Sequence, residues 1–317
     1  MIAGKRILIV GVNGFIGGAL YRFIQKNYPR TNLFGLCRSK ESSVKNIFQC
    51  DLNQRSQLKK TLQKIHPDYI FLLAGGRIEN KNELFLSNYS ATESLFDVVQ
   101  TLSKKKPRIL IPGTAAEYGI PDREKNVISE SCIAKPMYWY GYVKLMQTNL
   151  ALFYSRTGGD VVTARMFNIS GGGVPRHLAL GHFANDITRI ERKEIEPCLN
   201  TKNLSSKRDY LDINDVCTAL CLLMLKGVSG EIYNVCSGKS FAMRDLLDGL
   251  LFHSTRKDIK VIEDVRLSSE SLDIIGSNNK LKKLTGWKPV VKIEESLLQT
   301  LNYYRRISSE YENTNRA

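Results

Sequence analysis

A short apolar run that ends in three closely spaced glycines constrains the fold of this chain more than any other feature. The run from Arg6 to Gly11 is unbroken, as expected for a strand covered on both faces of a parallel sheet. Glycines stand at positions 11, 14 and 17, and a helical apolar pattern begins at Phe15. This order lets backbone N–H groups approach a pyrophosphate at the positive end of a helix. The Gly-x-x-Gly-x-x-Gly spacing therefore predicts a dinucleotide-binding unit.

Strands and helices alternate along most of the remaining chain. Further strands are expected at 32–38, 46–52, 68–74, 108–111, 160–166 and 230–238, and helices at 54–65, 83–103, 140–156, 181–193 and 214–226. Such alternation indicates a parallel sheet with helices on both faces. The pattern loosens from residue 168, and 196–207 is expected to be irregular. The predicted class is therefore α/β: a doubly wound parallel Rossmann sheet with a smaller mixed α/β C-terminal substrate lobe.

This interpretation divides the chain into two interwoven parts and a tail. Residues 1–167 are expected to form the dinucleotide-binding Rossmann domain, with a sheet completed by about 207–238. Residues 168–206 and 239–306 are expected to form the substrate-binding lobe, and 307–317 a polar tail. Folds of this kind bind ligands beyond the carboxyl ends of their strands. We therefore expect one cleft between the sheet and the lobe.

The composition argues against several other classes of function. The seven cysteines include no Cys-x-x-Cys pair, which predicts a reducing, cytoplasmic setting. No apolar run approaches the roughly 20 residues of a membrane helix, and the first strand starts too early for a signal peptide. Cys217 and Cys221 lie one helical turn apart without a nearby His, so no metal site is expected. The +15 charge is spread over the whole chain, which favours anionic nucleotide ligands over nucleic acid or membrane.

The end of the second expected strand predicts the choice of cofactor. NAD sites place an acid there to hold the ribose hydroxyls, whereas NADP sites place an arginine near the extra phosphate. This chain has Arg38 at that position, and its guanidinium can bind a phosphate through two parallel hydrogen bonds. We therefore predict NADP(H).

Two residues near the start of a later helix suggest acid–base chemistry. Tyr140 and Lys144 are four residues apart, so both side chains share one helix face. A phenol with a pKa near 10 is a poor proton donor at neutral pH, and an adjacent ammonium stabilises the phenolate. Thr114 follows the fifth expected strand. A Tyr-x-x-x-Lys spacing by itself is common and usually has no function, but here it follows a dinucleotide-type half-domain of five expected strands.

The motifs together resemble the short-chain dehydrogenase/reductase superfamily, in its extended branch, the NAD-dependent epimerase/dehydratase family, whose members modify nucleotide sugars. The matching stretches are the opening glycines, LLAGG (72–76), GTAAEYG (113–119), WYGYVK (139–144), ARMFN (164–168), KRDYLDINDV (207–216), YNVCSG (233–238) and TGWKP (285–289). The last four are most similar to the GDP-4-keto-6-deoxymannose reductase group.

The resemblance implies a role for each group of residues. The cofactor would be bound by Gly11, Asn13, Gly14, Phe15, Ile16, Gly17, Arg38, Asp51, Leu52, Ala74, Gly75, Gly76, Asn88, Tyr140 and Lys144. Tyr140 would protonate a sugar ketone, Thr114 would hold its oxygen, and Lys144 would also bind the nicotinamide ribose. The substrate would be bound by Thr114, Ala115, Asn168, Arg208 and Arg266. The helices that contain Asn88 and Tyr140 would pair across a homodimer.

Two alanines narrow the reaction. Related 4,6-dehydratases carry Asp-Glu directly after the threonine, to eliminate water, whereas this chain has Ala115 and Ala116. A ketoreductase needs only the tyrosine, lysine, threonine and NADPH. We therefore predict reduction of the C4 ketone of a nucleotide-diphosphate 4-keto-6-deoxyhexose. The alternatives are an NAD-dependent nucleotide-sugar C4 epimerase and a non-catalytic NADP-binding sensor.

Overall fold

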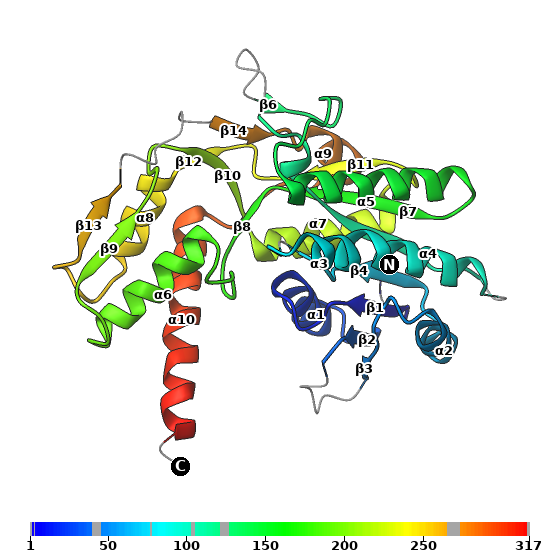
Figure 1. Ribbon diagram of the computed structural model, residues 1–317, viewed down its shortest axis with the longest axis horizontal. Helices are drawn as coiled ribbons and strands as arrows, with labels where there is room; N and C mark the ends of the chain where they lie inside the picture. The colour runs from blue at the N-terminus through cyan, green and yellow to red at the C-terminus, as the bar shows by residue number, and fades with distance from the viewer. Residues whose placement is uncertain are drawn as a thin grey trace.

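A computed structural model describes residues 2, 4–39, 46–76, 78–102, 105–120, 127–264 and 273–315, with side chains to 307. Figure 1 shows a large sheet with helices on both sides, and a smaller lobe beside it that contains the long C-terminal helix. The chain passes between these two parts more than once, because later segments return to the large sheet.

Within the described residues, seven parallel strands form the large sheet. Their order is β11 (Ile232–Val235), β7 (Val161–Met166), β5 (Arg108–Thr114), β4 (Tyr69–Leu72), β1 (Arg6–Val10), β2 (Asn32–Cys37) and β3 (Ile47–Gln49). The strand order reverses between β1 and β4, since the chain adds β2 and β3 on one side and β4, β5 and β7 on the other. Folds of this type bind ligands at such a reversal, beyond the carboxyl ends of the strands.

Helices cover both faces of this sheet. One face carries α1 (Phe15–Asn27), α7 (Ile213–Lys226) and α9 (Asn279–Thr285), and the other carries α2 (Arg55–Ile65), α4 (Ala91–Gln100) and α5 (Trp139–Arg156). Side chains of β1 alternate between the two cores: Ile7 and Ile9 pack on the first, and Leu8 and Val10 on the second. Burial on both faces explains why β1 is apolar at every position after Arg6.

The smaller lobe has its own sheets and its own core. In the described part of the chain, β12 (Ser240–Ala242), β10 (Lys207–Asp212), β14 (Asp273–Gly276) and β6 (Val127–Ile128) pair side by side, and β8 (Asn168–Ser170) joins β10. β9 (Cys198–Thr201) pairs with β13 (Lys260–Glu263). The helices α6 (Ala179–Glu191), α8 (Met243–Phe252) and α10 (Ile293–Asn315) enclose a third apolar cluster.

The predicted fold class is confirmed, and three local expectations need correction. The helix expected at 83–103 consists of α3 (Lys81–Phe85), a π-helical turn η1 (Leu86–Ser90) and α4. The segment expected to be irregular contains β9, which is stabilised by its distant partner β13 rather than by local pattern. Of the residues expected to complete the large sheet, only β11 does so, because β10 pairs with β8, β12 and β14.

Candidate active site

Glycines bring the turn after β1 into backbone contact with the turn after β4. Gly11 has a φ of +85°, and a Cβ there would lie 2.7 Å from the backbone nitrogen of Ala74. A Cβ on Gly17 would lie 2.1 Å from the carbonyl oxygen of Gly11. The turn therefore has no room for side chains at these two positions.

The amino end of α1 opens from this turn. Gly14 is the N-cap of α1, and both Asn13 and Gly14 are exposed. The first N–H groups of a helix have no partner inside the helix and attract anions. This cradle, which a Cβ would fill in part, fits the pyrophosphate of a dinucleotide, with Phe15 and Ile16 in the first helical turn.

The turns after β2 and β3 lie side by side at the same edge of the sheet. The backbone N–H of Cys50 donates to the carbonyl oxygen of Cys37 at 2.9 Å, and the Gln49 amide donates to the carbonyl oxygen of Arg38 at 3.0 Å. Arg38 is exposed, and Asp51 and Leu52 follow directly after Cys50. The expected adenosine-binding residues therefore lie at adjacent strand ends.

The turn after β4 is supported from behind by Asn88, in the π-helical turn η1. The Asn88 amide nitrogen donates to the carbonyl oxygens of Gly76 at 3.2 Å and of Leu84 at 2.9 Å. Gly75 has a φ of +94°, and a Cβ there would lie 2.6 Å from the Asn88 amide oxygen. Asn88 is 1% exposed, so its side chain supports the turn from Ala74 to Gly76, and direct contact with a cofactor remains a prediction.

The three expected catalytic residues come from two elements that pack closely together. Thr114 ends β5, Tyr140 is the second residue of α5, and Lys144 lies one turn further on. A Cβ on Gly141 would lie only 2.3 Å from the carbonyl oxygen of Ala116. The first turn of α5 therefore rests directly on the short helix η2 (Ala115–Glu117), which keeps Tyr140 close to the end of β5.

Lys144 is held in place by hydrogen bonds although it is almost completely buried. Its ammonium donates to the carbonyl oxygen of Pro112 and to the side-chain oxygen of Gln147. The Gln147 amide nitrogen in turn donates to the Thr92 hydroxyl at 2.6 Å. Burial lowers the pKa of Lys144 to about 8, against the opposing effect of the Glu117 carboxylate. The amine is therefore poised to titrate near neutral pH.

Two buried residues that the sequence motifs did not indicate, Gln147 and Glu117, are partners of the expected catalytic residues. Gln147 lies three residues after Lys144 on α5, which is the spacing of neighbours on one helix face. Glu117 stands three residues after Thr114 and accepts a hydrogen bond from its backbone N–H, so the two form a capping box. The pattern Thr-x-x-Glu is a recognised signal for this motif.

The expected substrate residues lie on the adjacent strands β8 and β10. Asn168 is paired in register with Tyr210, and its amide nitrogen donates to the carbonyl oxygen of Asp209 at 3.0 Å. Arg208 is half-buried, burial lowers its pKa, and Tyr138 at the start of α5 is among its electrostatic neighbours. The fold thus brings Arg208 to the same side of the molecule as the start of α5. Arg266 lies outside the described residues.

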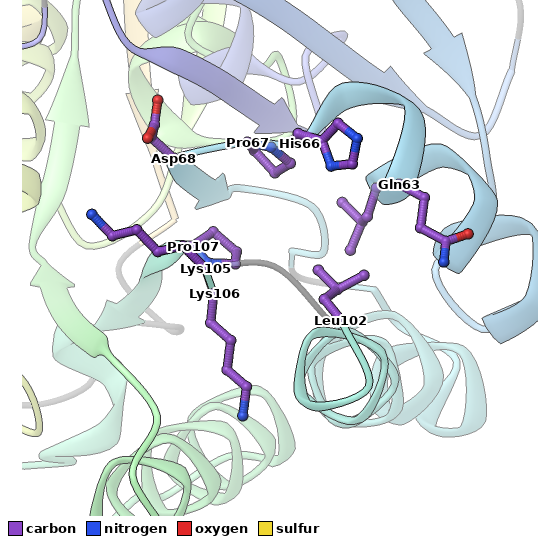
Figure 2. Close-up of a pocket in the computed structure, with 9 residues that line it drawn as sticks. Gln63, His66, Pro67, Asp68, Leu102, Lys105, Lys106 and Pro107 are labelled. Atoms are coloured by element: carbon purple, nitrogen blue, oxygen red, sulfur yellow. The ribbon is translucent and has the colours of Figure 1, made fainter.

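A pocket of about 180 Å³ lies at the opposite edge of the large sheet (Figure 2). Asp68 and Pro107, which directly precede β4 and β5, line it together with His66 and Lys105. The expected site residues follow the carboxyl ends of these strands instead. This pocket is therefore separate from the candidate active site.

The described residues show neither a metal centre nor a membrane span. Among them, no three His, Cys, Asp or Glu side chains gather as a metal site would require. None of the described helices is both long and apolar enough to cross a bilayer. The seven cysteines are all unpaired, and Cys217 and Cys221 are buried.

The large sheet is doubly wound and has a glycine turn after β1, and Tyr140 and Lys144 lie on a helix beside the end of β5. These features define the class of the protein, an extended short-chain dehydrogenase/reductase. The family model described as NAD dependent epimerase/dehydratase family matches residues 7–236. The chain belongs to this family, whose members use NAD(P) and act in nucleotide-sugar metabolism.

Comparison with known proteins finds relatives that act on GDP-linked 6-deoxy sugars. The GDP-6-deoxy-D-mannose reductase of Pseudomonas aeruginosa is 32% identical over 193 residues, which cover 60% of this chain and 61% of the relative. The GDP-6-deoxy-D-talose 4-dehydrogenase of Aggregatibacter actinomycetemcomitans is 26% identical over 285 residues, which cover 89% of this chain and 91% of the relative. The solved structure of RMD from Pseudomonas aeruginosa complexed with NADPH has a TM-score of 0.85 and 25% identity, and the match covers 96% of this chain and all of that one.

Proposed function

We propose that this protein is an NADPH-dependent reductase of the C4 ketone of a nucleotide-diphosphate 4-keto-6-deoxyhexose. The observation that supports the proposal most is the close packing of the first turn of α5, which carries Tyr140, on η2, the short helix that directly follows Thr114. The two residues that follow Thr114 are the half-buried Ala115 and Ala116, which supply neither the acid nor the base that a dehydration requires. The activities of the relatives named above support a 6-deoxy sugar as substrate.

Each residue of the site has a distinct task in this reaction. The Tyr140 phenol donates its proton to the ketone oxygen, and the nearby Lys144 ammonium stabilises the phenolate that remains. The Thr114 hydroxyl oxygen accepts a hydrogen bond from the backbone N–H of Ala116 at 3.3 Å, so its own proton can be donated to the ketone oxygen. Asn168 and Arg208 bind the diphosphate of the substrate, since a guanidinium pairs well with phosphate oxygens.

The strand ends provide a matching site for the cofactor. The amino end of α1 binds the pyrophosphate, and Arg38 binds the 2′-phosphate of the adenosine ribose, while Lys144 binds the nicotinamide ribose. When bound, the reduced cofactor would supply a hydride, which is one proton with two electrons, to the carbonyl carbon. The RMD structure with NADPH supports the NADP(H) assignment, as does the position of Arg38 at the end of β2.

We also infer a homodimer and a reducing compartment. The side chains of Tyr142 and Phe153 on α5 are 50% and 63% exposed in the monomer, and pairing of α4 and α5 with a second copy would cover them. The seven unpaired cysteines fit a cytoplasmic setting. Size-exclusion chromatography with light scattering, on the parent and on Phe153→Glu, tests the dimer: the variant should be monomeric.

In the decisive experiment, the protein is mixed with NADPH and, in turn, with each of a panel of nucleotide 4-keto-6-deoxysugars that differ in base and sugar, and the consumption of NADPH is measured. One member should consume reduced cofactor, and the product should be the corresponding 6-deoxysugar nucleotide. Purified protein that retains NAD and interconverts two C4 epimers without added reductant would favour the epimerase alternative. Tight NADPH binding without turnover of any member would favour the sensor.

A further inference from the structure

The short helix η2, which follows β5, holds a buried carboxylate that the proposed reaction does not use. Glu117 is completely buried at the end of η2, although it lies in the same turn as Thr114 and directly behind it. An isolated carboxylate is strongly disfavoured in such a place unless its oxygens are hydrogen-bonded or paired with a cation. The partners of Glu117 therefore indicate what the residue does.

One carboxylate oxygen fixes the position of Thr114. Glu117 Oε1 accepts a hydrogen bond from the backbone N–H of Thr114 at 2.7 Å. The same oxygen would lie 2.9 Å from a Cβ on Gly113, so the strand end fits closely around it. The end of β5 is thus held by its own following turn.

The other oxygen reaches two further elements. Glu117 Oε2 accepts from Arg165 Nε at 3.0 Å and from Arg165 Nη2 at 2.6 Å, and also from the Thr148 hydroxyl at 2.9 Å. Thr148 lies one helical turn after Lys144 on α5, and Arg165 on β7 lies three residues before Asn168. A single carboxylate therefore contacts the three elements that carry or directly precede Thr114, Lys144 and Asn168.

We propose that Glu117 is a positioning residue, whose buried carboxylate locks the Thr114 strand end, the Lys144 helix and the strand leading to Asn168 into one rigid unit. This inference rests on the proposed function, because it takes Thr114 and Lys144 as the groups that must be positioned. Buried ion pairs add little net stability when compared with well-packed apolar groups. The geometry therefore points to alignment of the site as the main effect of this pair.

The carboxylate has a second effect through its charge. Lys144 is 3% exposed and Arg165 is 3% exposed, so Glu117 is the anion between two buried cations. Of the charged groups, Glu117 acts on the Lys144 ammonium, and Arg165 is hydrogen-bonded to the same carboxylate. Tyr140 lies one helical turn before Lys144 on α5. The Glu117 carboxylate raises the pKa of Lys144 and so opposes the larger effect of burial. Without it, the ammonium would lose its proton at a lower pH.

The test uses Glu117→Gln, which keeps an oxygen acceptor for the Thr114 N–H but removes the charge. NMR titration of ¹³C-lysine-labelled protein, with the Lys144 signal assigned from Lys144→Arg, should give a midpoint near pH 8 in the parent and a clearly lower midpoint in the variant. The kcat for the 4-keto sugar should fall about 10- to 100-fold, as expected for a small displacement of a catalytic group, with little change in KM.

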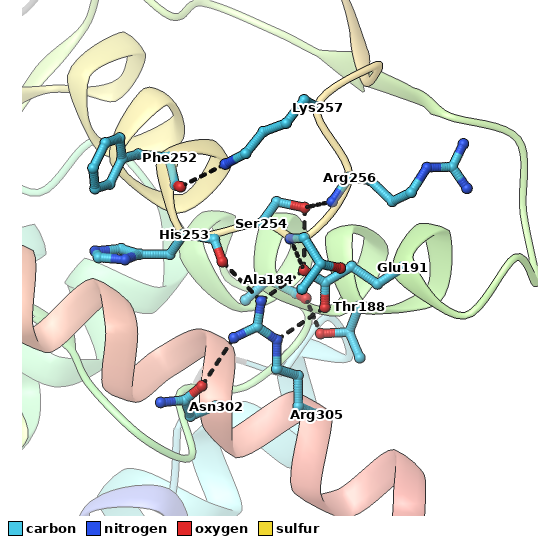
Figure 3. Close-up of polar contacts among 11 residues, drawn as sticks. Ala184, Thr188, Glu191, Phe252, His253, Ser254, Arg256, Lys257, Asn302 and Arg305 are labelled. Carbon is cyan, nitrogen blue, oxygen red and sulfur yellow. Dashed lines mark hydrogen bonds and ion pairs between the residues drawn. The ribbon is translucent and has the colours of Figure 1, made fainter.

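Glu191→Gln is the matched control in the smaller lobe. Glu191 is also a mostly buried carboxylate, and it accepts two hydrogen bonds from one arginine, Arg305, at 2.9 and 2.7 Å (Figure 3). It accepts another from the backbone N–H of Thr255. The control should lower the melting temperature and leave both the Lys144 midpoint and kcat at the parental values. Equal midpoints in Glu117→Gln and the parent, together with equal kcat, would overturn the proposal.

Thr148→Val covers the case in which Glu117→Gln does not fold. This variant removes one hydrogen bond to the carboxylate and leaves every charge in place, so the Lys144 midpoint should not move, while kcat should fall about tenfold. A folded variant with the parental kcat would contradict the positioning role. If the parent reduces no 4-keto sugar, the proposed function fails, yet the Lys144 titration in Glu117→Gln still tests the effect of Glu117 on its own.

Discussion

At the carboxyl ends of the strands in the large sheet, called the sheet edge below, backbone segments lie too close together for side chains. The smaller lobe is instead stabilised by contacts between the side chains of different helices. At the sheet edge, Gly11, Gly17 and Gly141 each lie against a backbone atom of another segment. In the lobe, an apolar cluster joins α6, α8 and α10, and Arg305 of α10 binds Glu191 of α6 (Figure 3). Substitutions at the sheet edge should therefore affect chemistry and cofactor binding first, and substitutions in the lobe should affect stability.

The largest effect expected at the sheet edge is that of Tyr140→Phe. The variant lacks only the hydroxyl that donates the proton, so turnover should fall by about 10² to 10⁴, while NADPH affinity stays close to that of the parent. Stopped-flow reduction and fluorescence titration of NADPH measure the two quantities separately. A variant as fast as the parent would remove Tyr140 from the mechanism.

Gly11→Ala tests whether close backbone approach controls cofactor binding. The new Cβ would have a φ of +85° and would lie 2.7 Å from the Ala74 nitrogen, so the two turns must separate. We expect NADPH binding to be lost and the free energy of unfolding to fall by about 1–3 kcal/mol or more. Gly286→Ala is the matched control, because Gly286 has a similar φ of +78° at the end of α9 with open space around it. This variant should lose a comparable amount of stability through backbone strain but bind NADPH normally.

Arg38→Ala probes the adenosine end of the same edge with a smaller expected effect. Loss of a charged hydrogen bond to the 2′-phosphate should weaken NADPH binding by about 1.5–3 kcal/mol, and NADH binding should hardly change. Isothermal titration calorimetry with both cofactors measures the difference. Equal weakening of the two would contradict the NADP(H) assignment.

The smallest effect expected is the acid sensitivity of the lobe. Burial alone would raise the pKa of Glu191, but hydrogen bonds from Arg305, the Thr255 N–H and Ser254 lower it below the usual 4.5. A carboxylate whose pKa is lower in the folded state than in the unfolded state stabilises the fold at pH values above the unfolded-state pKa. This contribution is lost as the pH falls through the folded-state pKa. Arg305 is 29% exposed, so Glu191→Gln should cost about 1 kcal/mol at pH 7.

Denaturation of the parent and of Glu191→Gln at pH 7 and at pH 3 measures this contribution. The difference between the two proteins should shrink at the lower pH, since the carboxylate of the parent is then increasingly protonated. A constant difference across the range would show that the ion pair does not carry the effect.

Much of the large sheet could be predicted because its strands and helices are specified by local pattern. β1 is apolar at every position after Arg6, and a 3.6-residue apolar period marks α1 from Phe15 onward. The smaller lobe could not be predicted to the same degree. β9 and β13 are short strands in which half of the residues are polar. They pair with each other across about sixty residues, and no local signal reports such pairing.

The sequence by itself determined the fold class and the identity of the expected catalytic residues, because a glycine turn and a Tyr-x-x-x-Lys pair depend on the residue types at fixed spacing. Tertiary structure alone decided which charges surround those residues. Glu117, Arg165 and Lys144 lie on three different elements, and they meet only because η2, β7 and α5 pack around the end of β5. Electrostatic interactions depend on distance in space and on burial, and neither is recorded in the order of residues along the chain.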